Sequence, residues 1–101
     1  MKLTKLLMTW NILPGREQDY IEFNGKEFVP RLLKLGLQPM DSWFTLYGDA
    51  PQITVGWVTD DEEVIYRAVE SDDWQDLQEK LADLVTDFRF KIVPATGYFQ
   101  I

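Results

Sequence analysis

Apolar and polar residues alternate from Leu3 to Leu13, which is the pattern of a half-buried β-strand. The Pro14-Gly15 pair ends this pattern. From there to Leu35 the apolar residues recur at helical spacing, which predicts a helix that Gly36 terminates. On the first strand, one face carries Leu6, Met8, Trp10 and Ile12, and the other carries Lys5, Leu7, Thr9 and Asn11.

The segment from Ile21 to Phe28 is open to a second interpretation. Asn24-Gly25 lies at its centre, and an Asn-Gly pair is typical of a two-residue β-hairpin turn. Pro30 lacks an amide hydrogen, so a helix that runs through it should kink or break there. The sequence leaves helix and hairpin as alternatives for this segment.

The stretch from Asp41 to Val58 organises the predicted fold. Two short runs rich in aromatic and β-branched residues are joined by a Gly-Asp-Ala-Pro turn. Gly48 and Pro51 prevent a single helix from crossing that join. We therefore predict a central β-hairpin around which the other elements pack.

Two helices are predicted after the hairpin. Thr59 and Glu62 have the spacing of a capping box and predict a short helix that runs through Ala68. Ser71, followed by two aspartates, is a favourable start for a second helix. The apolar residues that recur along this second helix are Trp74, Leu77, Leu81, Leu84 and Phe88.

The chain ends with one more predicted strand. Alternation from Phe88 to Val93 predicts it, and Pro94 to Gly97 should break it. Tyr98 to Ile101 then form an extended tail. The sequence does not decide whether this tail pairs within its own chain or with a neighbouring protomer.

The order of elements is strand, helix, strand, strand, helix, strand. This is the split βαβ plan, an α+β arrangement in which both helices cover one face of a four-stranded antiparallel sheet. We expect residues 1–101 to form one domain. The second face of the sheet is too aromatic to stay fully wet, so we expect two copies to pack sheet against sheet and enclose a cavity.

Charge and composition exclude several kinds of partner. With 17 acidic and 10 basic residues, the chain carries a net charge of -7, which repels nucleic acids and anionic lipids. It has no apolar run of about 20 residues and no signal-peptide pattern, so we expect a cytoplasmic protein outside the membrane. We therefore expect neither a nucleic-acid nor a membrane partner.

The absence of cysteine and histidine limits the possible chemistry. It removes the commonest general base, the thiolate nucleophile and the usual ligands of transition metals. The acidic cluster from Asp60 to Glu63 lacks the ligand pattern of a calcium loop and is better explained by helix capping. We expect no metal and no cofactor, and the sequence identifies no catalytic residue.

Candidate ligand-binding residues are those that alternate onto the predicted cavity face. Aromatic, amide and hydroxyl groups there could hold a small molecule, although strand aromatics more often serve as core or interface anchors. An arginine there could hold a carboxylate, but in an acidic chain it more often pairs with a neighbouring acid. The candidates are Thr9, Asn11, Trp43, Thr45, Tyr47, Thr54 and Arg89.

One further set of spaced residues comprises Pro14-Gly15, Pro30-Arg31-Leu32-Leu33-Lys34-Leu35-Gly36, Trp43, Gly48, Trp57, Arg67-Ala68 and Asp73-Trp74. This set resembles the NIPSNAP-like group of the dimeric α/β-barrel superfamily. The resemblance implies a ferredoxin-like protomer and a homodimer whose two sheets form a barrel.

The resemblance implies function only loosely, because the superfamily contains both enzymes and ligand-binding proteins. Our leading hypothesis is a protein that binds a small apolar or aromatic molecule between sheet and helices or in the barrel cavity. The alternatives are a cofactor-independent monooxygenase for a phenolic or polyketide-like substrate, with Asn11 as a catalytic candidate, and a structural interaction domain without a ligand. Haem degradation is disfavoured because superfamily members that degrade haem use a histidine, which this chain lacks.

Overall fold

The computed structural model describes residues 3–44 and 52–95, apart from the side chains of Asp41, Trp43, Phe44 and Ala95. The predicted turn at 48–51 and the tail at 98–101 lie outside the described residues. In chain order, the elements are β1 (Leu3–Ile12), α1 (Glu17–Phe23), the π-helix η1 (Asn24–Phe28), α2 (Val29–Lys34), β2 (Gln38–Phe44), β3 (Ile53–Thr59), α3 (Glu62–Val69), α4 (Asp72–Ala82) and β4 (Val85–Ala95).

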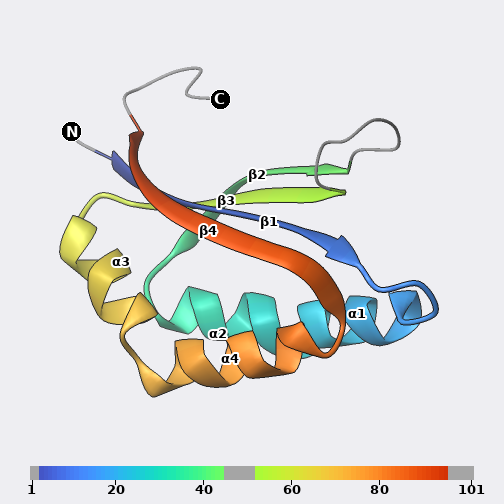
Figure 1. The fold of residues 1–101 in the computed structure, drawn as a ribbon. Helices are drawn as coiled ribbons and strands as arrows, with labels where there is room; N and C mark the ends of the chain where they lie inside the picture. Colours follow the sequence, from blue (N-terminus) through green and yellow to red (C-terminus); the bar gives the residue numbers. More distant parts are fainter. Residues whose placement is uncertain (1–2, 45–51, 96–101) are drawn as a thin grey trace.

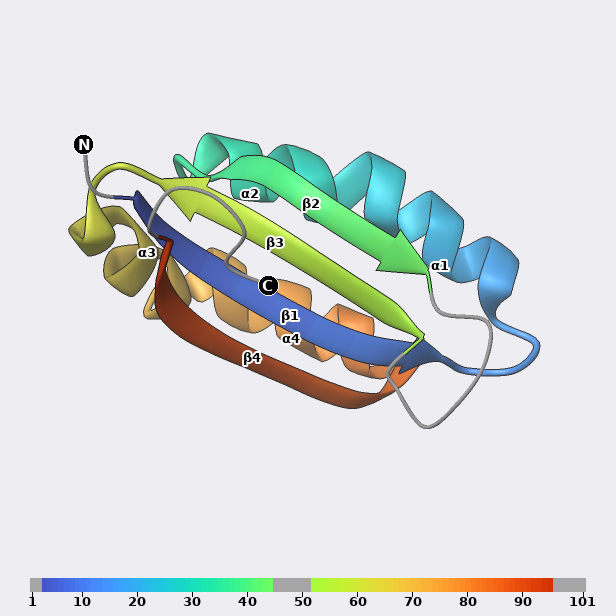
Figure 2. The same ribbon diagram turned by 90° about the horizontal axis from the view of Figure 1, so that it is seen from above.

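The four strands form one sheet in the order β2-β3-β1-β4, and every neighbouring pair is antiparallel. All described helices lie on one side of the sheet (Figure 1). Seen from above, the sheet lies in front of the helices (Figure 2). The predicted α+β fold with helices on one face is confirmed. The two inner strands are β3, which pairs with β2 and β1, and β1, which pairs with β3 and β4.

The segment from α1 to α2 is helical throughout, so the hairpin interpretation of Asn24-Gly25 is wrong. Asn24 has helical dihedral angles, and the backbone N–H of Val29 donates to the carbonyl of Asn24, five residues back. This wider π turn directly precedes Pro30, which lies in the first turn of α2. Because the hydrogen bonds change from the α to the π pattern just before Pro30, the helix continues through this proline without the predicted break.

Gly36 ends α2 as predicted. Its φ of 97° is in the left-handed region, which glycine adopts without a steric penalty. The N–H of Leu37 donates to the carbonyl of Leu32 at 3.2 Å, and the N–H of Gly36 donates to that of Leu33 at 3.0 Å. These two bonds form a Schellman motif and redirect the chain towards β2.

Both later helices form, but the first has a different cap. Asp61, and not Thr59, caps α3, because its carboxylate accepts a hydrogen bond from the N–H of Glu63 at 3.0 Å. The Thr59 hydroxyl instead accepts from the N–H of Asp61 at 3.3 Å. Ser71 caps α4 as predicted, through a 3.1 Å bond from the N–H of Trp74.

Two strands are longer than predicted. β2 begins at Gln38, three residues before the predicted hairpin. β4 begins at Val85 and continues past Pro94, which pairs with Thr4, so the predicted break at Pro94 is wrong. Proline is tolerated there because β4 is an edge strand, on which the missing N–H need not serve a second neighbour. The pairing of β2 with β3 confirms the two arms of the central hairpin.

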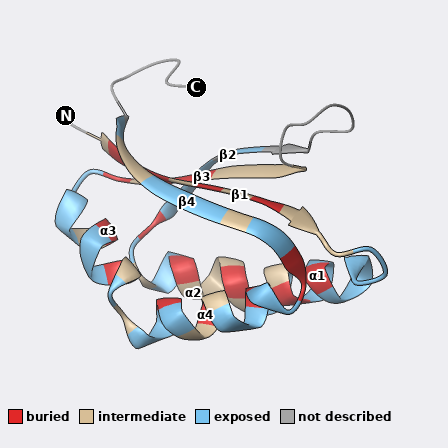
Figure 3. Ribbon diagram, viewed as in Figure 1, coloured by how far each residue is buried: buried red, intermediate tan, exposed pale blue. Residues whose placement is uncertain are grey.

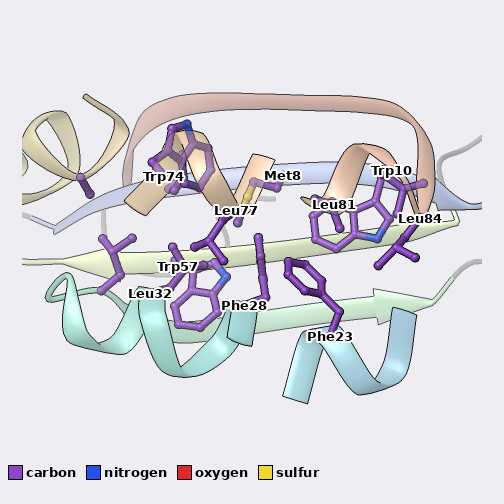
Figure 4. Packing of buried hydrophobic residues seen from close by; sticks show 14 of the residues in the cluster. Met8, Trp10, Phe23, Phe28, Leu32, Trp57, Trp74, Leu77, Leu81 and Leu84 are labelled. Carbon is purple, nitrogen blue, oxygen red and sulfur yellow. The ribbon is translucent and has the colours of Figure 1, made fainter. Parts of the chain in front are cut away.

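The core lies between the sheet and the helices, with buried residues on the helix faces that point to the sheet (Figure 3). Leu6, Met8 and Trp10, which alternate on β1, are each at most 1% exposed. Figure 4 shows side chains from both layers meeting there, Trp57 from the sheet and Phe28 from the helical run among them. Within the described ranges, no helix is long and apolar enough to cross a membrane.

Candidate functional site

A cavity of about 360 Å³ opens between the helical run α1–η1–α2 and the β2–β3 side of the sheet. Its walls are mostly apolar, and no lining residue carries a charge. The lining residues are Trp10, Tyr20, Asn24, Phe28, Val29, Pro39, Met40, Ser42, Ile53, Val55, Gly56 and Trp57.

Trp10 lines this cavity and also carries a buried indole N–H. The residue is 1% exposed, and its indole Nε1 has no hydrogen-bond partner among the described residues. Three rings hold the indole in place, with centroids 6.1 Å away for Tyr20, 5.8 Å for Phe28 and 6.0 Å for Phe88. A buried N–H without a partner costs free energy, so this position requires an explanation.

Tyr20 lies beside this donor. Burial raises the pKa of the Tyr20 hydroxyl, and the nearby N–H of Trp10 partly offsets that rise in the pKa. The two groups are thus close, but they do not meet the geometric criteria of a hydrogen bond, because Trp10 Nε1 stays unsatisfied. Tyr20 is therefore a protonated phenol at neutral pH.

Two further polar groups line the cavity. The carboxamide of Asn24, which is half-buried, and the hydroxyl of Ser42, which is exposed, make no side-chain hydrogen bond with any described residue. Asn24 is the first residue of η1, and π-helical turns occur frequently at functional sites. A mostly apolar cavity with a few polar groups is the usual form of a small-molecule site.

Thr9 and Arg89, two of the predicted site residues, lie on the opposite face of the sheet. Thr9 pairs with Thr54 on one side and with Arg89 on the other, and Thr54 pairs with Trp43. The sheet thus brings these four candidates into one row across all its strands. Thr45 and Tyr47 lie outside the described residues.

This row borders a shallow depression of about 360 Å³ over β1 and β4, lined by Leu7, Thr9, Arg89, Phe90 and Lys91. Neither Arg89 nor Lys91 makes an ion pair within the part of the chain that the structure describes. The depression is therefore a second candidate site, with a cationic rim in an acidic protein.

Asn11 lies at the end of β1, where both ends of its carboxamide are engaged. Its Nδ2 donates to Asp87 Oδ2 at 3.1 Å, and its Oδ1 accepts from the backbone N–H of Gln52 at 2.8 Å. The side chain of Gln52 accepts in turn from the N–H of Ile12 at 2.8 Å. These bonds connect the ends of β1, β3 and β4, so the side chain of Asn11 has a structural role.

Sequence reasoning allowed a ligand between sheet and helices, but its candidate residues include none of those that line the cavity there. It placed Trp10 on the buried face of β1 and treated it as core, because periodicity does not report whether a buried N–H has a partner. The one available signal was Asn24-Gly25, an unusual pair inside a predicted helix. In the described ranges, no group of acidic residues could hold a metal ion, and Asp61 of the acidic cluster serves as a helix cap.

No protein-family model matches this sequence, and no curated protein matches it significantly. Several solved structures share its fold. A NIPSNAP family protein from Agrobacterium tumefaciens is 17% identical, with a TM-score of 0.68 over 97% of this chain and 96% of that chain. An uncharacterized NIPSNAP-like domain protein from Burkholderia xenovorans is 15% identical, with a TM-score of 0.66 over 96% of this chain and 87% of that one. A dimeric protein of unknown function and ferredoxin-like fold from Bacteroides fragilis is 9% identical, with a TM-score of 0.59 over 92% of this chain and 96% of that one.

Proposed function

We propose that this chain, which has the ferredoxin-like fold of NIPSNAP proteins, forms a homodimer that binds a small, mostly apolar or aromatic molecule. The ligand is held in the cavity between β2–β3 and the helical run. The observation that carries the proposal is the cavity itself, which is mostly apolar, has aromatic walls and has no charged residue in its lining.

The shape and lining of the cavity support this proposal. A volume of about 360 Å³ is within the range of small-molecule sites, which begins near ~300 Å³. Phe28 and Trp57 supply flat apolar walls, and Asn24 and Ser42 supply polar groups that a ligand can reach. The absence of charge from the lining favours an uncharged, largely apolar occupant.

Ligand uptake is tested by thermal unfolding with a panel of aromatic compounds. A ligand present at 100 times its dissociation constant stabilises a protein by about 2.7 kcal/mol, or about 10 °C for a domain of this size. The variant Ser42→Trp fills the exposed mouth of the cavity and should abolish the shift. Gln75→Trp, an exposed position on α4 outside the cavity, should keep it. A panel without any stabilising compound, or an undiminished shift in Ser42→Trp, would contradict the proposed site.

The homodimer uses the face of the sheet that no described helix covers. Leu7 lies at the centre of that face on β1 and is only half-buried in the single chain. A solved structure with the same fold is described as dimeric, which supports the same assembly here. Leu7→Glu places a charge in the proposed interface and should give a monomer in light scattering. Ile21→Glu is the matched control, because Ile21 is 60% exposed on α1. A wild-type monomer, or a Leu7→Glu dimer, would argue against this interface.

The row of Trp43, Thr54, Thr9 and Arg89 is a second candidate site, inside the barrel that such a dimer forms. Its support is the strand register, which aligns residues from all four strands. If aromatic compounds stabilise Ser42→Trp as strongly as wild type, this row is the next place to test. The oxygenase alternative stays a prediction, for which oxygen uptake with a panel of hydroquinols is the assay.

A further inference from the structure

Two irregularities of the backbone border the same cavity. One is the π-helix η1, which begins at Asn24, and the other is a β-bulge in the edge strand β2. Pro39 and Asp41 pair with consecutive residues of β3, so Met40 between them has no partner there. Asn24 and Met40 both line the cavity. Since π turns and bulges each occur frequently at functional sites, their meeting at one cavity directs attention to these residues.

The bulge decides which residue of β2 comes into register with the cavity. Val55 of β3 is one of the lining residues. With regular pairing from Pro39 onward, the partner of Val55 would be Asp41. The extra residue makes Ser42 the partner of Val55 instead, and Ser42 lines the cavity. The bulge thus puts a hydroxyl where regular pairing would put a carboxylate.

Met40 lies at the open side of the cavity. It is 45% exposed, whereas Phe28 and Trp57 in the same lining are 2% and 4% exposed. Pro39 and Ser42, its neighbours in the lining, are exposed as well. The cavity therefore has a buried inner end with aromatic walls and a mouth along β2.

Methionine suits a mouth that adapts to its ligand. Its side chain is unbranched, with three rotatable bonds and a polarizable sulfur that packs favourably against aromatic rings. Because no residue of β3 stands directly opposite Met40, no cross-strand neighbour fixes its side chain. The sulfur can therefore pack on a ligand ring that also contacts Phe28 or Trp57.

We propose that Met40 closes the mouth of the cavity over an aromatic ligand and makes the site selective for aromatic rings over saturated rings of the same size. This inference rests on the proposed function and names both the ligand class and the residue that selects it. Met40 contacts the ligand through its thioether, and the bulge is the device that brings this side chain to the mouth.

The proposal predicts discrimination between two matched probes. 2-Naphthol and decahydro-2-naphthol share one skeleton and one hydroxyl group, are uncharged at pH 7, and differ in the aromaticity of their rings. The wild-type protein should bind 2-naphthol at least about twofold more tightly. Calorimetric titration measures both affinities.

Variants identify the residue that makes this choice. Met40→Leu conserves volume and apolar character, so it should lower the ratio of the two affinities by about two- to tenfold. Met8→Leu is the matched control, because Met8 is buried outside the cavity lining, and it should keep the ratio.

A spectroscopic signal reports the contact directly. The chain has three methionines, and in protein labelled with ¹³C at the methionine methyl groups the Met40 signal is the one that Met40→Leu removes. Saturating 2-naphthol should give this signal a ring-current shift, which the saturated probe cannot produce. The Met8 signal should move less.

The outcomes separate this inference from the proposed function. Equal affinities for the two probes, an unchanged ratio in Met40→Leu, or an unshifted Met40 signal in the saturated 2-naphthol complex would each overturn the role of Met40 and leave the cavity as a binding site. The same spectra are recorded with any other aromatic compound of the panel that binds. Failure of both probes and of the whole panel would overturn the inference and the proposed function together.

Discussion

Asn11 offers a test of whether a predicted catalytic candidate is in fact structural. Its Oδ1 accepts from the N–H of Gln52 at 2.8 Å, and its Nδ2 donates to Asp87 Oδ2 at 3.1 Å. The residue thereby extends the contact between β1 and β3 one position beyond the last paired residues, Trp10 and Ile53. Asn11→Ala removes both bonds and leaves the part-buried N–H of Gln52 without its partner.

The expected loss of stability can be estimated from these contacts. An unsatisfied, part-buried N–H costs about 1–2 kcal/mol, and the exposed bond to Asp87 contributes about 0.5 kcal/mol. We expect a total near 2 kcal/mol, which lowers the midpoint of thermal unfolding by about 8 °C for a domain of this length. Urea and thermal unfolding followed by circular dichroism measure the change.

A charge exchange sharpens the test. Asn11→Asp keeps the acceptor for Gln52 but places a second carboxylate opposite Asp87, and it should destabilise the protein at neutral pH. Adding Asp87→Asn reverses donor and acceptor and should recover most of the stability. Asparagine also suits that position, because Asp87 has a φ of 57° in the left-handed region. An Asn11→Ala variant within about 0.5 kcal/mol of wild type, or no recovery in the double variant, would refute the structural role.

Three further predictions concern stability. Gly25→Ala should stabilise the protein by about 0.5–1 kcal/mol in urea unfolding, because Gly25 is helical and an added methyl group meets nothing within 4 Å. Gly36→Ala should instead destabilise the protein by about 1–2 kcal/mol, because the φ of Gly36 is 97° and the added methyl group meets Val64 Cγ1 at 3.0 Å. Equal effects of the two glycine variants would contradict this reasoning. Arg31 donates to the Asp76 carboxylate at 2.7 Å and holds the pKa of that carboxyl below its ordinary value. The contribution of this pair to the stability of the fold is therefore complete above about pH 5 and is lost as the pH falls below about 4. Arg31→Met should therefore differ from wild type in urea unfolding at pH 7 much more than at pH 2.5, and a difference independent of pH would count against it.

The strand and helix order could be predicted because alternation reports directly which face of an element is buried. On β1, the side chains predicted to face the helices, Leu6, Met8 and Trp10, are at most 1% exposed. The same alternation placed Thr9 and Thr54 together on the other face, and the strand register bears this out. Periodicity is a reliable guide wherever one face is packed and the other is not.

The π turn could not be predicted, because tertiary packing decides it. Phe23 and Phe28 are both buried, at 8% and 2% exposure, with ring centroids 5.9 Å apart. In a regular α-helix, residues five apart point about 140° away from each other. The π turn brings both rings onto the sheet, and local sequence preferences cannot report that gain. The same limit applies to the cavity, whose existence depends on the gap between two layers.

The two faces of the sheet are connected through the irregular start of β4. Between Thr9–Arg89 and Asn11–Thr86 the register shifts, so that β4 has one more residue than β1. Asp87 lies in this bulge in a left-handed conformation, and Asn11 binds its carboxylate. A bulge changes the direction of the side chain that follows it. Here that residue is Phe88, whose ring stacks on the indole of Trp10 with ring centroids 6.0 Å apart and an interplanar angle of 24°.

Asn11 thus supports, through Asp87 and Phe88, the indole of Trp10, which lines the cavity. An Asn11 variant that loses ligand binding or activity would therefore not by itself identify a catalytic residue, since a displaced indole would have the same effect. The exchanged pair Asn11→Asp and Asp87→Asn separates the two roles. It rebuilds the support for Trp10 while changing the chemistry at position 11, so that binding returns if Asn11 is structural and activity stays lost if Asn11 is catalytic.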